Sequence, residues 1–158
     1  MNFETVRKEH DWIEFLTQAD TNVTYMFVFN RMITRLRGAS DILYIGKTHQ
    51  SIGRRYEQET SVNNTAGNTQ QTNIRMTHVF KELGIANVKC YYTRTLRHTL
   101  SADDRTRWLG YCRTWDKKFC LQLEKQQKGQ TLEIPLEKYL LVCYAADNLE
   151  VPPMNNRM

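Results

Sequence analysis

The chain has 158 residues, of which 41% are hydrophobic and 25% are charged, a balance that predicts one soluble globular domain over residues 1–158. Its net charge of +5 favours a polyanionic partner, although a ribosomal or other cytosolic protein can be equally basic by chance. The chain has no signal-peptide core and no apolar run long enough to span a bilayer, so we expect a cytoplasmic protein with no membrane partner.

The four cysteines have no spacing typical of metal ligands. None forms a C-x-x-C pair, and no histidine stands at zinc-ligand spacing from them. We therefore expect buried, reduced thiols at Cys90, Cys112, Cys120 and Cys143.

The first part of the chain predicts a helix followed by a hairpin. Apolar residues at helical spacing predict an N-terminal helix within residues 1–20. β-branched and aromatic residues then predict strands over residues 23–29 and 41–45. Strands joined this closely are expected to form an antiparallel hairpin with an enlarged basic tip at residues 30–40.

The middle of the chain alternates helical, loop and strand patterns. A short helix is expected from Ser51 to Gln58, followed by an Asn- and Thr-rich loop over residues 60–72. The next apolar stripe predicts a helix that ends at Gly84. Residues 88–93 then predict a third strand.

The last third of the chain is predicted to be mainly helical. Ser101-x-x-Asp104 resembles a capping box, and a helical insertion is expected over residues 97–130. Pro135 is expected to begin a final helix that runs from Leu136 to about Ala146. Together the elements predict an α+β fold, with a small, three-stranded, mostly antiparallel sheet flanked by helices.

One motif stands at the end of the second predicted strand. Tyr44-Ile-Gly-Lys-Thr48, followed by Ile52-Gly-Arg-Arg55, resembles the second half of the signature of the GIY-YIG nuclease family. The first half is weaker, because Thr24-Tyr25 stands where the family has Ile-Tyr and Val23 replaces its glycine.

Two further elements follow in the order that the family has. These are a glutamate on a late helix, Glu137, and a Pro-x-Asn tail that ends at Asn155. The resemblance covers about residues 22–156. It implies the GIY-YIG nuclease fold, with the helical insertion placed before the glutamate helix.

The resemblance also implies an activity. Members of the family are Mg²⁺-dependent endonucleases, with Mn²⁺ as a possible substitute, and hydrolyse DNA to 5′-phosphate and 3′-hydroxyl ends. The chain looks most similar to small stand-alone members, which are phage endonucleases and type II restriction enzymes acting in a bacterial or phage-infected cell. Because a double-strand break needs two active sites, a homodimer or higher homo-oligomer is expected.

Two other functions are compatible with the same residues. One is a non-catalytic nucleic-acid-binding module on the nuclease fold. The other is a structure-selective repair nuclease, a class that usually carries extra domains.

Glu137 is the candidate metal ligand. It is the only acidic residue in the apolar stretch from Leu136 to Ala146, and it shares a helix face with Leu141 and Tyr144. A buried carboxylate is costly unless a cation compensates it, and Mg²⁺ typically takes one or two carboxylates. The alternative is a carboxylate stabilised by the dipole at the helix N-terminus, because Glu137 follows Pro135 closely.

Arg54 and Arg55 are both candidates for the arginine that binds the scissile phosphate. A guanidinium stays charged and contacts two phosphate oxygens at once. Family spacing from Tyr44 favours Arg54, whereas spacing from Ile52 favours Arg55. Adjacent helical residues point in different directions, so only one can face the sheet, and we favour Arg55.

Tyr25 and Tyr44 are expected on neighbouring strands, where both hydroxyls could reach one water or phosphate oxygen. The resemblance implies that one acts as general base, which requires a lowered pKa that Lys47 and the metal could supply. Ordinary strand aromatics are the alternative. Asn155 is expected to tie the tail to the site, with Asn156 as a weaker candidate.

The chain departs from the family one helical turn after the arginine. Many members have His or Tyr there, whereas this chain has Gln58 or Glu59. Either another residue, such as His78, takes that role, or the proton moves through water.

Three basic segments are candidates for DNA contact. They are the hairpin tip, the stretch from Arg94 to Arg97, and residues 105–118 with interleaved aromatics. The alternative for each is a solvated surface, and Trp108 and Trp115 fit a core better than a stacking platform. The candidate DNA-binding side chains are Arg31, Arg35, Arg37, Arg107, Arg113 and Lys117.

Overall fold

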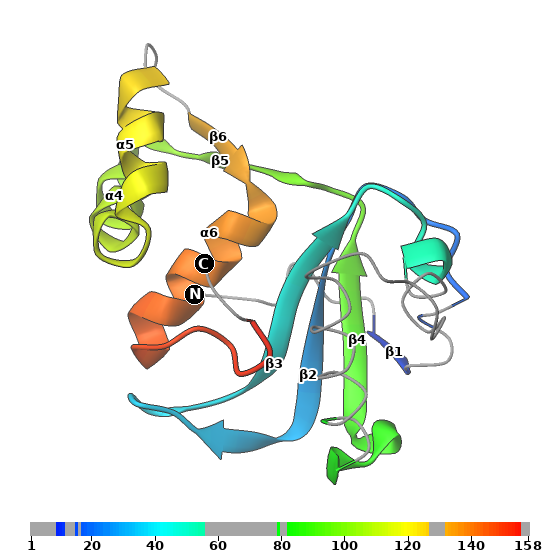
Figure 1. Cartoon of the computed structure of the whole chain (residues 1–158). Coiled ribbons are helices and arrows are strands. Elements are labelled where there is room, and N and C mark those ends of the chain that lie inside the picture. Colours follow the sequence, from blue (N-terminus) through cyan, green and yellow to red (C-terminus); the bar gives the residue numbers. More distant parts are fainter. Residues whose placement is uncertain are drawn as a thin grey trace, which may run out of the picture.

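The larger sheet of the computed structural model has four antiparallel strands. The structure describes residues 9–11, 15, 17–55, 79, 82–126 and 132–155. The strand order is β1 (Glu9–Asp11), β4 (Val88–Thr93), β2 (Val23–Thr34) and β3 (Ala39–Thr48), which makes β3 an edge strand (Figure 1). The predicted α+β class is therefore confirmed, and the three predicted strands are joined by a short fourth one.

A second layer packs beside this sheet. It contains a two-stranded sheet of β5 (Arg97–Leu100) and β6 (Leu132–Pro135), with α4 (Ala102–Trp115) and α5 (Lys117–Gln126). Helix α6 (Leu136–Asn148) lies between this layer and the main sheet (Figure 1). A 3₁₀ turn, η2 (Ile85–Asn87), follows Gly84 and leads into β4.

The N-terminal helix predicted within residues 1–20 is wrong at Glu9–Asp11. These residues form β1, which pairs with β4 through Glu9 opposite Tyr91 and Asp11 opposite Lys89. Without β1, the backbone of β4 would be an open edge of the sheet. Pairing with β4 gives hydrogen-bond partners to backbone N–H and C=O groups that a helix would pair internally. Most of the other residues of the predicted helix lie outside the described part.

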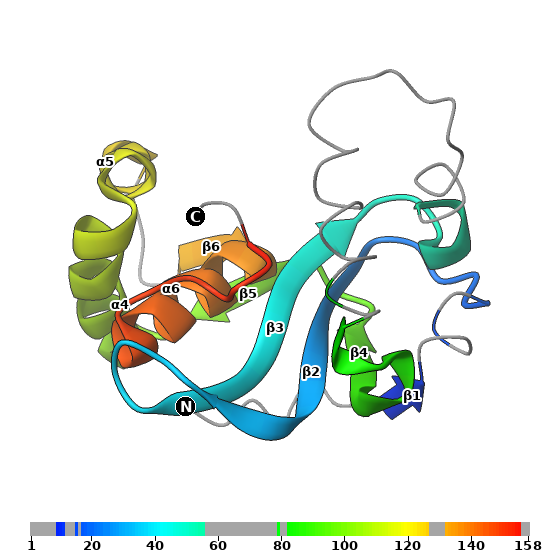
Figure 2. The same ribbon diagram turned by 60° about the horizontal axis from the view of Figure 1, so that its bottom comes forward.

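The hairpin strands are longer than predicted. β2 and β3 extend to Thr34 and from Ala39, so the connection shrinks from residues 30–40 to a short turn. Register shifts between Phe27 and Ile33 let the strands curve, as bulges do (Figure 2). The last five residues of β2, 30–34, are mostly solvent-exposed. They therefore lack the alternation of apolar and polar positions that predicts a strand.

The helical insertion predicted over residues 97–130 begins with a strand instead. Leu100 lies opposite Leu132 in the pairing of β5 with β6, and both are buried against α4 and α5. A four-residue strand is too short to give a periodic pattern. The predicted helix start is confirmed: Ser101 caps α4, and its hydroxyl accepts a hydrogen bond from the Asp104 amide at 3.2 Å.

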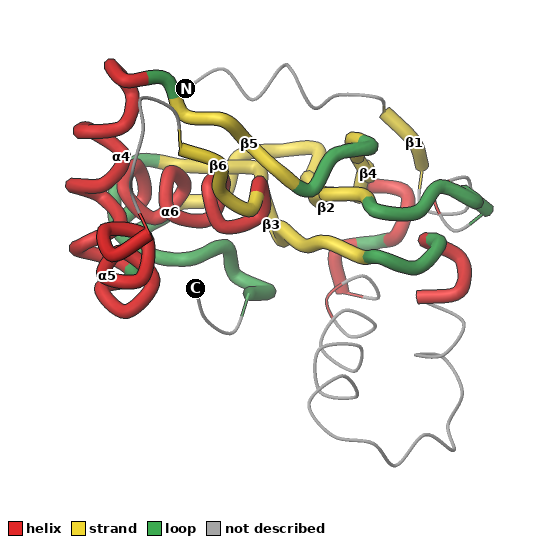
Figure 3. Tube along the Cα trace, turned by 90° about the horizontal axis from the view of Figure 1, so that it is seen from above, coloured by secondary structure: helices red, strands yellow, loops and turns green. Residues whose placement is uncertain are grey.

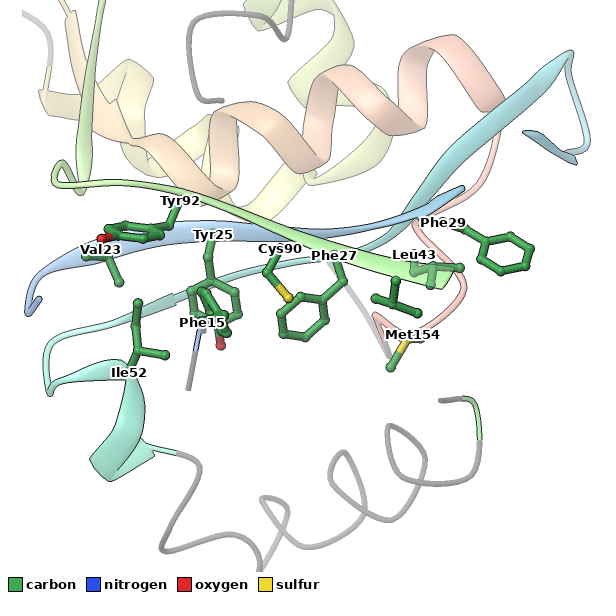
Figure 4. Close-up of a cluster of buried hydrophobic side chains, with 11 residues drawn as sticks. Phe15, Val23, Tyr25, Phe27, Phe29, Leu43, Ile52, Cys90, Tyr92 and Met154 are labelled. Atoms are coloured by element: carbon green, nitrogen blue, oxygen red, sulfur yellow. The ribbon is translucent and has the colours of Figure 1, made fainter. Parts of the chain in front are cut away.

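The two faces of the main sheet bury different clusters. On the face away from α6 the aromatic side chains of Phe15, Tyr25 and Phe27 pack together with Ile52 (Figure 4). On the other face, Leu140 and other apolar residues of α6 pack against the sheet. Strand alternation assigns each side chain to one cluster or the other. All four cysteines are buried and free, as predicted.

Helix α6 begins at Leu136 and thus follows Pro135 directly, as predicted. It ends at Asn148, and the capping residue Leu149 adopts a left-handed φ of 61°. Within the described residues, none of the helices has the length and apolar character needed to cross a membrane.

Candidate active site

Two tyrosines and a glycine form the centre of the candidate site. The β2–β3 register places Tyr25 opposite Gly46 and Phe27 opposite Tyr44, so both phenol rings lie on the face away from α6. The ring centroids of Tyr25 and Tyr44 are 6.0 Å apart. A Cβ atom at Gly46 would lie 2.5 Å from Cε1 of Tyr44 and 3.0 Å from Oη of Tyr25. Gly46 therefore provides the space in which the two rings meet.

The surroundings of Tyr44 raise the pKa of its phenol well above the usual value of 10. Burial is the largest cause, followed by the charges of Tyr25 and Glu137, and the Arg55 guanidinium opposes them only in part. A phenol with a raised pKa stays protonated at neutral pH. The lowered tyrosine pKa that general-base catalysis requires is therefore absent at Tyr44 in the protein alone.

The two arginines after the glycine motif occupy different environments. The side chain of Arg55 buries its Nε atom and lies close enough to Tyr44 for its charge to act on the phenol. Arg54, by contrast, is solvent-exposed. Ile52, three residues before Arg55, is fully buried in the same cluster as Tyr25. Of the two arginines, Arg55 is thus the one whose charge lies near Tyr44, which is the arrangement that spacing from Ile52 predicts.

Glu137 reaches the site from the first turn of α6. Its Oε2 atom lies 3.2 Å from Nζ of Lys47, at the end of β3. The carboxylate also acts on Tyr44, so Glu137, Arg55 and Tyr25 all influence one phenol. Residues from β2, from the segment after β3 and from α6 therefore lie within electrostatic range of the Tyr44 phenol.

Asn155 fixes the chain tail to β3 beside the glycine motif. Its Oδ1 accepts a hydrogen bond from the Ile45 amide at 3.0 Å, and its Nδ2 donates to the Ile45 carbonyl at 2.8 Å. The Met154 amide donates to the Leu43 carbonyl at 3.0 Å. The side-chain amide of Asn155 thus pairs with the open edge of β3 as a neighbouring strand would, at the residue between Tyr44 and Gly46.

Asp20, which sequence reasoning did not single out, lies at the same end of the sheet. It forms an ion pair with Arg94 at 2.9 Å between Oδ1 and Nη2, and it accepts a hydrogen bond from the Tyr92 hydroxyl at 2.5 Å. Tyr92 lies opposite Tyr25 in the β2–β4 register. An isolated acidic residue before a strand gives no signal of this contact in the sequence.

The arginines of the hairpin tip lie at the far end of α6 from Glu137. Arg35 is 7% exposed, and its Nε lies 4.0 Å from Oε1 of Glu150. Nη1 of Arg37 donates to the Ala146 carbonyl at 3.3 Å. These two side chains hold the hairpin against the C-terminus of α6, where a cation complements the helix dipole. Arg31 is exposed and lies over the Phe29 ring at 5.1 Å from its centroid.

The two candidates on α4 also have partners within the protein. Arg113 forms an ion pair with Glu124, and Arg107 donates to the Tyr111 hydroxyl at 3.1 Å. Lys117 is exposed at the start of α5. Trp108 is buried, as the core interpretation predicted. The structure does not bring these residues to the tyrosine pair: they belong to the outer helical layer (Figure 3).

Glu137 offers one hard oxygen ligand to a metal. Within the described ranges, no three His, Cys, Asp or Glu side chains gather where they could hold an ion. A single carboxylate suits Mg²⁺, which keeps several waters and takes few protein ligands. The donor chemistry thus fits such an ion. The other possible proton-transfer residues, Gln58, Glu59 and His78, lie outside the described residues, as does Asn156.

Comparison of the chain with protein-family models, with curated proteins and with solved structures finds no match.

Proposed function

We propose that this chain is a metal-dependent DNA endonuclease of the GIY-YIG type, which hydrolyses phosphodiester bonds to 5′-phosphate and 3′-hydroxyl ends. The observation that supports the proposal is the packing of Tyr44 against Tyr25 over Gly46, with Arg55 and Glu137 near enough for their charges to act on the Tyr44 phenol. Asn155 adds support because it binds the same strand at the adjacent Ile45.

Each of these residues has a task that its chemistry suits. Arg55 would bind the scissile phosphate, because a guanidinium stays charged and donates two parallel hydrogen bonds. Glu137 would hold a Mg²⁺ or Mn²⁺ ion, which when bound supplies charge neutralisation at the phosphate. Tyr25 is 1% exposed, so it acts by orienting Tyr44 rather than by touching the substrate.

Tyr44 itself would serve as a hydrogen-bond donor. Its raised pKa keeps the proton on the phenol at neutral pH, and that proton can orient an attacking water or a phosphate oxygen. Because Tyr44 is already protonated, the proton of the attacking water would pass to solvent or to another group.

The test is cleavage of plasmid DNA in the presence of Mg²⁺ by the parent chain and by two variants. Glu137→Ala should lower the cleavage rate by at least about a hundredfold, the usual size of an electrostatic contribution to catalysis. Glu133→Ala is the matched control, because that carboxylate is exposed and pairs with Arg97 at 3.7 Å, away from the tyrosines. It should cut at the parental rate.

End analysis of the products separates the candidate functions. Ends that a ligase joins directly are 5′-phosphate and 3′-hydroxyl ends and support the proposed reaction. Binding of DNA without cleavage in Mg²⁺ or Mn²⁺, on duplex, branched and single strands, would support the non-catalytic module instead. A linear plasmid product, together with sedimentation as a dimer or larger species, is expected for the double-strand-cleaving oligomer that we propose.

A further inference from the structure

Lys47 already compensates the charge of Glu137. The Nζ–Oε2 distance is 3.2 Å, and the side chains of Lys47 and Glu137 are 38% and 24% exposed. The two residues come from different elements, the end of β3 and the first turn of α6. This pair is half-buried, so solvent screens it less than a pair on an open surface.

Strand alternation separates Lys47 from the tyrosine pair. Gly46 and Tyr44 face away from α6, whereas Lys47 lies opposite Thr24 in the register and shares its face with Ile45, which packs against α6. The strongest charge effects on Tyr44 come from Tyr25, Glu137 and Arg55. From the sequence, Lys47 is expected to lower the pKa of a tyrosine. In the structure its ammonium group contacts the Glu137 carboxylate instead.

We propose that Lys47 is the resident counter-ion of Glu137 and controls how tightly this carboxylate binds a divalent cation. The inference rests on the proposed function, in which Glu137 is the metal ligand. An ammonium group at 3.2 Å competes for the carboxylate oxygen and repels a second cation placed beside it. The protein thereby keeps the carboxylate compensated at low metal concentration and requires more metal to fill the site.

The same helix offers a matched comparison. Lys138, the residue after Glu137, forms an ion pair with Asp116 at 2.7 Å, and both side chains are slightly more buried than the Lys47–Glu137 pair. Removing either lysine therefore deletes one ammonium from a half-buried pair on α6. Only the loss of Lys47 uncovers Glu137.

The test measures Mn²⁺ binding to the full chain by electron paramagnetic resonance, without DNA. Lys47→Met, which keeps the apolar stem, should bind Mn²⁺ at least about fivefold more tightly than the parent, because one nearby positive charge is removed. Lys47→Arg keeps the charge and should stay within about twofold of the parent. Lys138→Met should also bind as the parent does. Thermal unfolding in EDTA checks that each variant is folded.

The outcomes separate this inference from the proposed function. If Glu137→Gln abolishes Mn²⁺ binding while Lys47→Met and Lys138→Met bind equally, Glu137 is the ligand and the counter-ion role of Lys47 is wrong. If Glu137→Gln binds Mn²⁺ as the parent does, the metal assignment itself fails, and the inference fails with it. Tighter binding by Lys47→Met alone, lost again in Lys47→Met/Glu137→Gln, supports the inference.

Discussion

The absence of a side chain at Gly46 allows the rings of Tyr25 and Tyr44 to pack together. The two phenol rings occupy the space that a Cβ atom would take, and strands on either side fix the backbone. A methyl group there must push Tyr44 or Tyr25 away, and a core that is already well packed resists such a shift.

Gly46→Ala should therefore lower the free energy of unfolding by about 1–3 kcal/mol and reduce DNA cleavage strongly. The control is Gly110→Ala, because that position lies in α4 with nothing within 4 Å of the added Cβ. Alanine is the better helix former, so the control should be stabilised by up to about 1 kcal/mol and cleave normally. Urea unfolding and plasmid cleavage measure both quantities. Parental stability and activity in Gly46→Ala would contradict the proposed packing.

Arg55 illustrates a choice that local sequence left open. Arg54 and Arg55 both follow Gly53. Spacing from Tyr44 favours Arg54, and spacing from Ile52 favours Arg55. The burial of Ile52 fixes the orientation of this turn, so that Arg55 lies beside Tyr44 and Arg54 faces solvent.

At the scale of single elements, the arginines of the β2–β3 hairpin have two different environments: two of them contact the end of α6, and one is exposed to solvent. Arg35 and Arg37 hold the turn against the end of α6, whereas Arg31 is exposed near the end of β2. All three are candidates for DNA contact from the sequence, with a solvated surface as the alternative. Burial removes Arg35 from that role, because its charge is already enclosed by Tyr144 and Glu150.

We predict opposite effects for two substitutions in this hairpin. Arg35→Met should lower the free energy of unfolding by up to about 1 kcal/mol, since the Glu150 carboxylate loses the cation beside it. Arg31→Met should change stability by less than about 0.5 kcal/mol. It should weaken DNA binding and reduce the slope of log affinity against log salt by about one, as loss of one phosphate contact does. Fluorescence anisotropy on a labelled duplex at several salt concentrations measures the slope; an unchanged slope would exclude Arg31 from the interface.

At the scale of the whole molecule, α6 contributes side chains to the hydrophobic clusters of both layers. Leu140 and Leu141 pack against the main sheet, and Val142 and Cys143 pack against the layer of α4, α5, β5 and β6 (Figure 3). A helix buried on two sides couples the layers, so they should unfold together.

Leu140→Ala tests this coupling. It should lower the free energy of unfolding by about 2–4 kcal/mol, because Leu140 is buried in the cluster on the sheet side. Circular dichroism and tryptophan fluorescence should give the same denaturation midpoint, although two of the three tryptophans, Trp108 and Trp115, lie in the helical layer. Leu121→Ala, at an exposed position of α5, should leave the midpoint nearly unchanged. Two separate midpoints in the parent or in Leu140→Ala would show that the layers unfold independently.

By itself, the sequence determined the elements whose signals are local. The β-branched and aromatic runs that become β2, β3 and β4, the serine cap of α4 and the proline before α6 each act through neighbouring residues. The order of the motif residues likewise grouped Tyr25, Tyr44, Glu137 and Asn155 as one predicted set. Local chemistry and apolar patterning carry this information along the chain.

Tertiary structure alone decided what depends on contacts between distant segments. β1 and the β5–β6 pair exist because each strand meets a partner that short-range patterns cannot specify. The choice of Arg55, the burial of Arg35 and the pairing of Lys47 with Glu137 follow from which face each element presents. The packing of Tyr44 against Tyr25 over Gly46 belongs to this second group, because strand register brings the three residues together and burial then raises the pKa of the phenol.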